Sequence, residues 1–591
     1  MVVFYEKYCC IISDKMKYVE VYVNHRLNSD DKLLYSLKPE DLYKIKIGQL
    51  IEVPFRNKNI LAVVVKFTSK IVDYKVKNIR RILSGKIFNN VHFELAKYLS
   101  IQYYSPINKN IFSLYGDIPK KINENKTLNI EDKVIDEKNI EYYFSNDRQR
   151  IKFYKKLIDK KIKLLFVFAT ISRAEEFARL INYKNKIYSN NLSLADRYDL
   201  IYKFSKNNIS TIIGTRQAIF LQSNTDYSVV IDEYNHLGHK NDSHPNYRSE
   251  EIVKILSKYG IKIYLFSTSP TISSINHKWN YLIDKQPKIL LKSYLKSVDL
   301  NYYIESLAKT NKKILIYNPI YRSTSIFCTD CNEYVKCDSC WQNVTGIKIN
   351  GQIFCKNCQL DLVDNKCNVC KGANIKLTRF GLEDNLKLIK NVTDSYTEIS
   401  SYNIGNIVDS NKIVLATSKI FDCFNLKFDT VIMFNFDFLF SSKKYNYDEE
   451  IIALISNLKK MAMSELIITT KNEENDFFKI KTQNDLKVFY QLIIKKRLEY
   501  KLQPFYTIID IVTQDKNPFK LKKDSDKIHK NLIKINKIIC NNFTENIYNS
   551  KTKQWQMLLR IKIKKDENLS IKTELKDIIY NLPNNWRYKV N

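Results

Sequence analysis

The sequence predicts an α/β protein with two parallel-sheet lobes, and three features of the chain carry that prediction. Short apolar segments alternate with amphipathic helical patterns through the middle of the chain, which is typical of strands that are each followed by a helix. Eight of the 12 cysteines form Cys-x-x-Cys pairs that interrupt the second series of these strands. The 591 residues are enough for roughly four domains, so smaller domains are expected at both ends.

The two ends of the chain show strand-like segments of their own. Tyr18–Val23 alternates in the manner of a half-buried strand, and Gly48–Phe55 with Leu61–Val65 predicts a hairpin around a polar turn. These segments, followed by a helical tail, indicate a β-rich N-terminal domain. Near the other end, Thr507–Val512 and Gln556–Ile563 are strand-like and indicate a small α+β domain.

Two series of apolar strand candidates define the lobes. The first series is Leu164–Phe168, Thr211–Ile213, Ser228–Ile231 and Lys262–Phe266. The second series is Ile314–Tyr317, Ile413–Ala416, Thr430–Phe434 and Glu465–Thr469. The expected divisions are an N-terminal domain at 1–118, a polar linker at 119–139, a first lobe at 140–295, a second lobe at 296–325 and 373–490, a cysteine module at 326–372 and a C-terminal domain at 491–591.

The cysteine pairs predict bound metal. They are Cys328 with Cys331, Cys337 with Cys340, Cys355 with Cys358, and Cys367 with Cys370. A two-residue gap lets both thiolates of a pair face one ion, and two pairs complete a tetrahedral Zn²⁺ shell. Four pairs therefore predict two structural zinc sites, which the spacing alone allows to combine in more than one way. Disulfides or unligated thiols are the other interpretation, but the chain starts without an export signal and so indicates a reducing compartment.

The charge balance predicts a polyanionic partner. Lys and Arg outnumber Asp and Glu by 96 to 63, which gives a net charge of +33. Nucleic acid is the first candidate for such a surplus, and an anionic membrane surface is the second. Part of the surplus also fits AT-rich coding, since Lys, Asn, Ile and Tyr are all abundant. No apolar run approaches the roughly 18 residues of a membrane span, so membrane is not an expected partner.

Several short motifs fall in order along this framework. The first series of strands carries Ile213–Phe220 (IGTRQAIF), Val229–His236 (VVIDEYNH) and Phe266–Pro270 (FSTSP). The second carries Leu415–Lys419 (LATSK), and Leu502–Phe505 (LQPF) opens the C-terminal part. With the cysteine pairs at their place in the second lobe, the chain resembles the primosomal protein N′ (PriA) family, the superfamily-2 helicases that restart bacterial replication forks. The likeness covers nearly the whole chain.

The resemblance implies two RecA-like helicase lobes, an N-terminal domain that captures the 3′ end of a DNA strand, and two Zn²⁺ ions. In the family the cysteine pairs are nested, which places Cys328, Cys331, Cys367 and Cys370 on one ion and Cys337, Cys340, Cys355 and Cys358 on the other. It also implies binding to forked or single-stranded DNA and contacts with the replicative helicase, its loader and single-strand binding protein. The expected state is a monomer in the bacterial cytoplasm, associated with the nucleoid.

The nucleotide motifs of this family are missing from the chain. A P-loop needs glycines whose backbone N–H groups close around phosphate, yet residues 117–213 contain no glycine. The stretch that matches the P-loop is Phe144–Arg150 (FSNDRQR). The family's arginine segment in the second lobe is replaced by Ser456–Ala462 (SNLKKMA), and lysine is a poor substitute where a planar guanidinium is needed.

Some residues with a family role remain. Asp232 and Glu233 match the metal-binding and water-orienting carboxylates of the acidic motif, although the Glu-His pair that should follow is Tyr234–Asn235. In the N-terminal domain, Leu34 replaces the carboxylate that accepts the terminal 3′-hydroxyl. Tyr35 is then the DNA-binding candidate, either stacking on a base or sugar or packing in the core.

These observations predict a DNA-binding replication-restart protein that acts in primosome assembly without ATP-driven unwinding. The motifs that build the fold persist and those that touch nucleotide are lost, so ATP and Mg²⁺ are not expected to serve as working cofactors. The alternative is an enzyme, an ATP-dependent 3′–5′ DNA helicase with an unrecognised nucleotide site. A third interpretation, in which the zinc module is a docking surface for protein partners, is compatible with the first.

Overall fold

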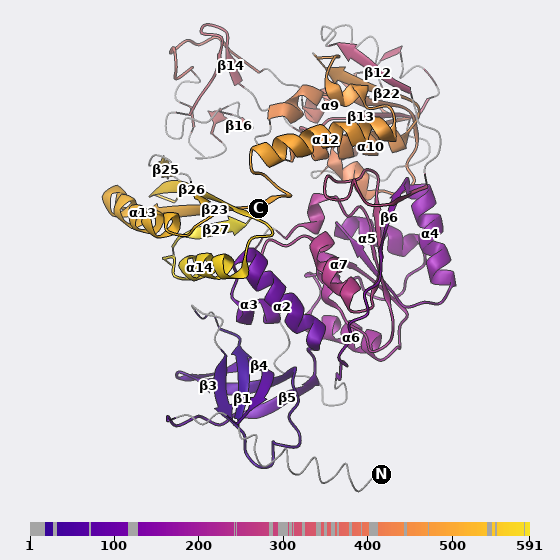
Figure 1. Cartoon of the computed structure of the whole chain (residues 1–591). Helices are drawn as coiled ribbons and strands as arrows, with labels where there is room; N and C mark the ends of the chain where they lie inside the picture. The colour runs from indigo at the N-terminus through magenta and orange to yellow at the C-terminus, as the bar shows by residue number, and fades with distance from the viewer. Residues whose placement is uncertain are drawn as a thin grey trace.

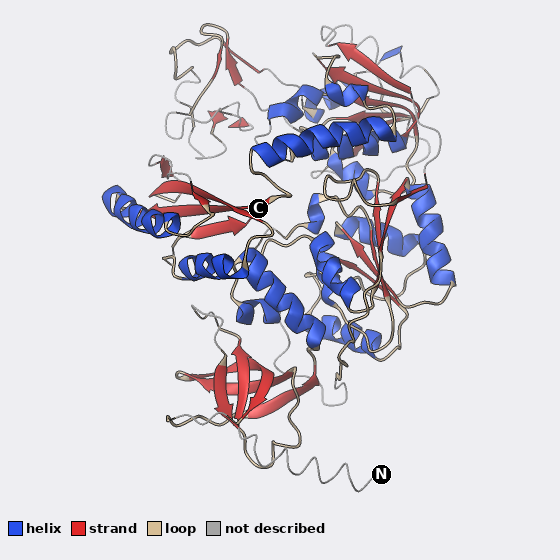
Figure 2. Cartoon of the chain, in the orientation of Figure 1, coloured by secondary structure: helices blue, strands red, loops and turns tan. Residues whose placement is uncertain are grey.

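The computed structural model of the chain is shown in Figure 1. The structure describes residues 18–25, 27, 32–69, 73–115, 128–241, 243, 245–282, 288–293, 305–306, 310, 312–321, 326–337, 344, 346–347, 352–355, 361–362, 366–377, 381–391, 393–400, 412–441, 446–470, 472–540, 547–549, 552–583 and 585–590. Within them, an N-terminal sheet, two sheets flanked by helices, a small cysteine module and a C-terminal sheet are distinguished (Figures 1 and 2).

The N-terminal domain contains a five-stranded antiparallel sheet in the order β2-β1-β4-β3-β5. Its strands are β1 (Tyr18–Val23), β2 (Leu33–Ser36), β3 (Gln49–Phe55), β4 (Lys58–Thr68) and β5 (Arg81–Lys86). The predicted hairpin is β3 with β4, and Arg56 adopts the left-handed conformation in its turn, with φ 52°. Alternation along β1 sends Val19, Val21 and Val23 into one core and Tyr22 into another.

Two helices link this sheet to the rest of the molecule. They are α2 (Asn90–Tyr103) and α3 (Ile107–Ser113). The side chain of Asn89 caps α2 by accepting the backbone N–H of His92, and the ring of His92 in turn accepts the N–H of Asn89. Buried residues of both helices share one core with the first lobe and the C-terminal domain, so the N-terminal part is anchored to both (Figure 1).

The predicted linker at 119–139 is wrong over its described part. Leu128 and Ile130 are fully buried in the shared core, and Asp136 forms a bridge with Tyr259 of the first lobe. The stretch is polar overall, so its composition did not indicate that two of its apolar side chains would pack against the lobe. Residues 119–127 lie outside the described residues.

The first lobe is an all-parallel sheet in the order β11-β6-β10-β9-β7-β8. Its strands are β6 (Ile140–Ser145), β7 (Leu164–Phe168), β8 (Thr211–Thr215), β9 (Ser228–Ile231), β10 (Lys262–Ser267) and β11 (Trp279–Leu282). Its helices are α4 (Asp147–Asp159), α5 (Ile171–Leu180), α6 (Leu194–Ser205) and α7 (Ser249–Lys258), with short 3₁₀ turns η2 (Arg216–Phe220) and η3 (Leu237–His239). The central strands are buried on both faces, which is why they form continuous apolar runs in the sequence.

The second lobe repeats this plan in the order β12-β22-β21-β13-β20-β19, again all parallel. Its strands are β12 (Lys288–Ser293), β13 (Ile314–Tyr317), β19 (Tyr396–Ile399), β20 (Ile413–Ala416), β21 (Phe428–Met433) and β22 (Ala462–Thr470). Its helical elements are α9 (Leu382–Lys390), η5 (Ser418–Asp422), η6 (Phe436–Ser441), α10 (Tyr447–Met461), α11 (Asp476–Lys479) and α12 (Gln483–Glu499). The predicted pair of α/β lobes is confirmed.

Two of the predicted divisions need correction at the second lobe. β12 precedes the expected boundary at 295, yet it pairs with β22, so it belongs to the second lobe. Helix α12 runs past the expected end at 490, and Ile493 packs in the core of the second lobe. Both errors arise because sheet pairing and helix packing are set by contacts that local sequence patterns do not contain.

The cysteine module is inserted between β13 and α9, as expected. It contains a three-stranded antiparallel sheet of β14 (Ile326–Cys328), β15 (Glu333–Tyr334) and β18 (Ile375–Leu377), and a pair of β16 (Gly346–Ile347) with β17 (Ile353–Phe354). Strand β18 lies beyond the predicted end at 372 and pairs with β14, so the module extends to Leu377. Its buried side chains form a core of their own.

The C-terminal domain is built on a five-stranded antiparallel sheet. Its elements are β23 (Tyr506–Asp515), α13 (Pro518–Ile533), β24 (Ile539–Cys540), β25 (Ile547–Asn549), β26 (Gln554–Lys564), α14 (Leu569–Tyr580) and β27 (Arg587–Val590). In the described part of the chain, no helix has both the length and the hydropathy that a bilayer span requires.

Candidate functional site

The acidic motif lies at the carboxyl edge of the first sheet. Asp232 and Glu233 follow β9 directly, and their side chains are almost completely buried. Glu233 adopts the left-handed conformation, with φ 48°, which is uncommon for a residue with a side chain. The carboxyl ends of parallel strands form the usual ligand-binding edge of such sheets. The pair therefore lies where parallel sheets usually bind ligands. Its hydrogen-bond and ion-pair partners indicate which role it has here.

The first partner of the acidic pair is Arg150, which comes from the stretch that matches the P-loop. Its Nη1 lies 2.9 Å from Asp232 Oδ1 and 2.9 Å from Glu233 Oε1. Its other nitrogens donate to the hydroxyl and the carbonyl oxygen of Ser145, at 3.2 Å and 3.1 Å. The side chain is fully buried, so this guanidinium is held entirely by the protein.

Arg173, from α5, is the second cation at the motif. Its Nε donates to Asp232 Oδ2, and its Nη2 lies 2.8 Å from Asp147 Oδ1. Its Nη1 donates to the carbonyl oxygen of Phe421 in the second lobe at 2.8 Å, and its guanidinium lies 3.8 Å from the ring centre of Phe424. Arg173 therefore connects the acidic motif to the opposite lobe.

Lys460 completes the set from the second lobe. It lies in the segment that replaces the family's arginines, and its Nζ is 3.2 Å from Glu233 Oε1 and 3.4 Å from Asp147 Oδ1. Three buried carboxylates thus meet three cations across the lobe boundary. We call these residues the interlobe charge network: Asp147, Arg150, Arg173, Asp232, Glu233 and Lys460.

Every carboxylate oxygen of the acidic pair is filled by protein donors. Besides its arginine contacts, Asp232 accepts the hydroxyl of Tyr154 at 2.9 Å. Glu233 Oε2 accepts both the backbone N–H and the hydroxyl of Thr268, at 3.1 Å and 3.3 Å. A Mg²⁺ ion takes oxygen ligands in a near-octahedral shell. At this pair it would compete with two arginines and a lysine for the carboxylates, so the contacts are those of a structural ion cluster.

The turn before α4 leaves no room for a phosphate loop. β6 ends at Ser145 and α4 begins at Asp147, so Asn146 alone separates the strand from the helix. The side chain of Asn146 accepts the backbone N–H of Gln149 at 3.0 Å. A P-loop holds phosphate with several free backbone N–H groups in a glycine-rich bend between strand and helix. The one-residue turn at Asn146 differs from such a bend.

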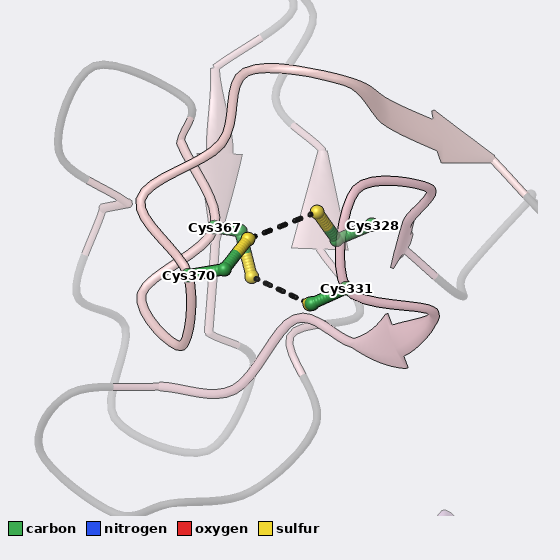
Figure 3. A group of neighbouring side chains, drawn as sticks. All are labelled: Cys328, Cys331, Cys367 and Cys370. Carbon is green, nitrogen blue, oxygen red and sulfur yellow. Dashed lines mark hydrogen bonds between the residues drawn. The ribbon is translucent and has the colours of Figure 1, made fainter.

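Four cysteines of the module converge on one point (Figure 3). Cys328 Sγ lies 3.5 Å from Cys370 Sγ, and Cys331 Sγ lies 3.9 Å from Cys367 Sγ. All four sulfur atoms lie within 4.8 Å of one another, which suits a single tetrahedral metal ion. This set joins the outermost pairs, as the resemblance implied, and not pairs that are neighbours in the sequence.

The backbone around this cluster favours metal binding. The residues that follow each pair, Asn332 and Lys371, are left-handed with φ 56° and 61°. The backbone N–H of Gly372 donates to Cys370 Sγ at 3.4 Å, a contact that stabilises a thiolate. Of the second predicted set, Cys337 and Cys355 are buried in the module core, while Cys340 and Cys358 lie outside the described residues.

Comparisons with known proteins find similarity over most of the chain. The family model for the PriA 3′ DNA-binding domain matches residues 20–115. Replication restart protein PriA of Helicobacter pylori is 20% identical over 541 residues, covering 82% of this chain and 86% of the relative. Replication restart protein PriA of Buchnera aphidicola is 22% identical over 600 residues, covering 78% and 83%. The chain is a PriA-like protein. A solved structure of the DUF1998 helicase MrfA bound to DNA and AMPPNP covers 60% of this chain and 48% of its own at 10% identity and a TM-score of 0.31.

Tyr35, the DNA-binding candidate of this PriA-like protein, and its neighbour Leu34 lie in β2 of the N-terminal sheet. Tyr35 is 5% exposed and packs in the core of the N-terminal sheet, where its hydroxyl donates to the carbonyl oxygen of Pro54 at 3.0 Å. Its neighbour Leu34 pairs with Glu20 of β1. These contacts favour the packing role that the sequence also allowed for Tyr35, because a base could reach the ring only if this core opened.

The sequence did not reveal the cations that fill the acidic motif. Arg150 lies in the stretch that matches the P-loop, where the missing glycines were the only signal. Arg173 comes from a different helix, α5. A signal was present, since the buried face of α4 carries Ile151, Tyr154 and Leu157, and Arg150 lies on that same face. An arginine on a buried helical face needs buried acids as partners.

The network lowers the pKa values of its carboxyl groups. Burial alone would raise the pKa of Asp147, but Lys460, Arg173 and Arg150 outweigh burial and lower it to about 2. Burial opposes ionisation of Asp232 and Glu233 as well, and the neighbouring cations again prevail and lower both pKa values. The three groups are therefore ionised throughout the physiological pH range.

We expect the folded state to lose stability as the pH falls from about 5 to about 2. A carboxyl group whose pKa is lower in the folded state stabilises the fold above its unfolded pKa of about 3.9, and that contribution disappears as the pH falls through the folded pKa. Urea midpoints measured across this range test the expectation. The variant Asp147→Asn should show a shallower pH dependence than the parent, and equal slopes for the two would contradict it.

Proposed function

We propose that this PriA-like protein binds forked or single-stranded DNA and takes part in replication restart without ATP-driven unwinding. The observation that carries the proposal is the acidic pair. Each carboxylate oxygen of Asp232 and Glu233 accepts at least one protein donor, and three of the four accept two, so a metal-bound nucleotide would compete with buried cations for the pair.

Loss of hydrolysis is supported by two further features. The one-residue turn at Asn146 cannot cradle phosphate, and Lys460 stands in the segment where the family carries arginines. An arginine finger alone contributes on the order of 10³–10⁵ in rate. The stretch that matches the P-loop, the contacts of the acidic pair and the segment that matches the family's arginines all differ from the family pattern. The usual sources of charge stabilisation for phosphoryl transfer are therefore missing. The alternative, an ATP-dependent 3′–5′ helicase, would require the network to open.

DNA binding is supported by the 3′ DNA-binding domain match at 20–115 and by the net charge of +33. Contacts between lysines and phosphates release counterions, so such binding weakens steeply with salt. The four-cysteine cluster supports a bound metal ion, and we extend this to two Zn²⁺ ions shared by the eight cysteines. The zinc module then recruits the replicative helicase, its loader or single-strand binding protein, in a monomer that works in the bacterial cytoplasm at the nucleoid.

A phosphate-release assay with forked DNA and Mg-ATP tests the loss of hydrolysis. We expect no DNA-stimulated turnover, because neither phosphate nor metal has its usual ligands. A rate of about 1 s⁻¹ or faster would overturn the proposed loss of hydrolysis and favour the helicase alternative.

Fluorescence anisotropy with the same forked DNA tests the binding half independently. The affinity should fall by about 10³ between about 50 mM and about 200 mM salt if at least six phosphates are contacted. A protein that fails to bind forked and single-stranded DNA at the lower salt concentration would refute DNA binding, whatever the result of the phosphate-release assay.

A further inference from the structure

The two lobes, which lie side by side in Figure 1, are joined by apolar contacts as well as by the charge network. Phe424 of the second lobe packs in a core of the first, where its ring centre lies 6.3 Å from those of Phe168 and Phe177. Ile272, which follows β10 of the first lobe, packs in the core of the second. The two inserted side chains are 5% and 4% exposed. Each lobe thus contributes an apolar side chain to a core of the other.

A short segment of the second lobe makes the first of two polar contacts. We call residues 421–424 the latch segment, and its last residue is the inserted phenylalanine. The carbonyl oxygen of Phe421 accepts Arg173 Nη1 at 2.8 Å. The carboxylate of Asp422 accepts the hydroxyl of Thr170, the N-cap residue of α5, at 2.6 Å. The latch segment therefore contacts the start of α5 through a backbone group, a carboxylate and a ring.

The second polar contact lies on other elements of both lobes. The backbone N–H of Ile272 donates to Glu449 Oε1 of α10 at 2.7 Å. The carbonyl oxygen of Pro270 accepts the hydroxyl of Tyr490 of α12 at 3.0 Å, and that tyrosine is fully buried. Glu449 is itself held by an ion pair with Arg497 Nη1 at 3.0 Å. The acceptor for the Ile272 amide is therefore fixed in place before the lobes meet.

Opening of the lobes would have to break both contacts together. A hinge motion that separates the latch segment from α5 uncovers Phe424, and one that separates β10 from α10 uncovers Ile272. Exposing either side chain to water is unfavourable. Lys460 would also leave its two carboxylates, and its side chain is only 7% exposed. Domains of one chain are expected to move relative to each other unless their interface is well packed and apolar, and this interface is.

We propose that the two lobes form a single rigid body whose arrangement is set by protein contacts alone, with the latch segment as its main fastening. The inference goes beyond the proposed function, because loss of hydrolysis by itself would leave the lobes free to move. A ligand shifts a conformational equilibrium only as far as it prefers one state. With the open state so disfavoured, DNA meets a surface whose shape does not respond to nucleotide.

The backbone amide of Ile272 reports on the lobe contact, because its hydrogen bond crosses the boundary. Hydrogen exchange at this amide is measured in the full-length protein alone, with Mg-ATP, and with Mg-ATP and forked DNA. We expect slow exchange in the protein alone, and a change of less than about twofold on adding either ligand.

Two variants of the latch segment should loosen the contact. Phe424→Ala should speed exchange at the Ile272 amide about 100-fold, because it removes the inserted ring. Asp422→Ala removes one acceptor and should speed it about fivefold. Phe478→Ala is the matched control, since Phe478 is half-buried in the second lobe and its ring contacts Phe436 of the same lobe. It should leave the exchange of this amide unchanged.

Amides of β13, inside the second lobe, show whether Phe424→Ala has unfolded that lobe. If it has, Asp422→Ala carries the test, because Asp422 is only half-buried and its loss spares the core. The inference fails if the Ile272 amide of the parent exchanges as fast as an exposed loop, or if Mg-ATP slows it tenfold or more. It also fails if the latch variants exchange like Phe478→Ala. Phosphate release and DNA anisotropy, measured separately, report on the proposed function and not on the rigidity of the lobes.

Discussion

Replacing Asp232 with alanine should destabilise the first lobe by about 3–5 kcal/mol. The substitution removes one carboxylate from a buried, balanced network and leaves Arg150 and Arg173 facing each other with too few acids. Both guanidinium groups are at most 3% exposed, so water cannot take the place of the carboxylate. An uncompensated buried charge costs far more than the net contribution of an intact ion pair.

Hydrogen exchange at the backbone amides of β7 and β9 measures this change locally, which matters because a chain of several domains does not unfold in one step. Asp226→Ala is the matched control, since Asp226 is exposed and lies just before the same strand. The double variant Asp232→Ala with Arg150→Met restores the charge balance and should be more stable than Asp232→Ala alone. Equal protection in Asp232→Ala and Asp226→Ala would show that the network contributes nothing.

The network gives the acidic pair a structural role that does not depend on hydrolysis. Asp232 and Glu233 form ion pairs with Arg150 and Arg173 of the same lobe, and Glu233 also pairs with Lys460 of the second lobe. Once arginines occupy the motif, its acids are needed for folding. Their presence in the sequence is then no sign of hydrolysis.

The strands of the lobes were predictable because burial on both faces leaves a direct trace in the sequence. β7, β9, β13 and β20 have the bounds expected from their apolar runs. β12 was missed, since it carries two lysines among its six residues and lies outside the second series of apolar runs. Strand positions were therefore predictable where the core dictates composition and not at this sheet edge.

The two sites differed in how much the sequence revealed. The Cys-x-x-Cys spacing predicts a metal site from local sequence. The sulfur atoms of Cys328, Cys331, Cys367 and Cys370 lie together, as the nested arrangement implied. The interlobe charge network depends on side chains from separate helices, of which Arg173 and Lys460 belong to different lobes. No local pattern encodes such a meeting. The missing glycines predicted that a P-loop would be absent, and the structure shows that Arg150 of the same stretch contacts the acidic pair.

Removing metal from the cysteine module should unfold the module and leave the lobes intact. Cys328 and Cys367 are fully buried beside each other, and without an ion their thiolates would repel or take up protons. Structural zinc supplies on the order of 10–16 kcal/mol to small cysteine folds at neutral pH, more than so small a core provides alone. The module has its own buried cluster, separate from the clusters of the second lobe, so its unfolding need not spread.

Metal analysis and limited proteolysis test this together. The parent should contain two Zn²⁺ ions per chain, and Cys328→Ser should lose one of them and become cleavable within 326–377. Cys423→Ser is the matched control, because Cys423 lies outside the cluster in the second lobe and should change neither metal content nor cleavage. A Cys328→Ser protein that keeps its full metal content would rule out this cluster as a ligand set. If chelation instead unfolded the strands of the second lobe, the module could not be an independent insertion, and its separate core would be insufficient to isolate it.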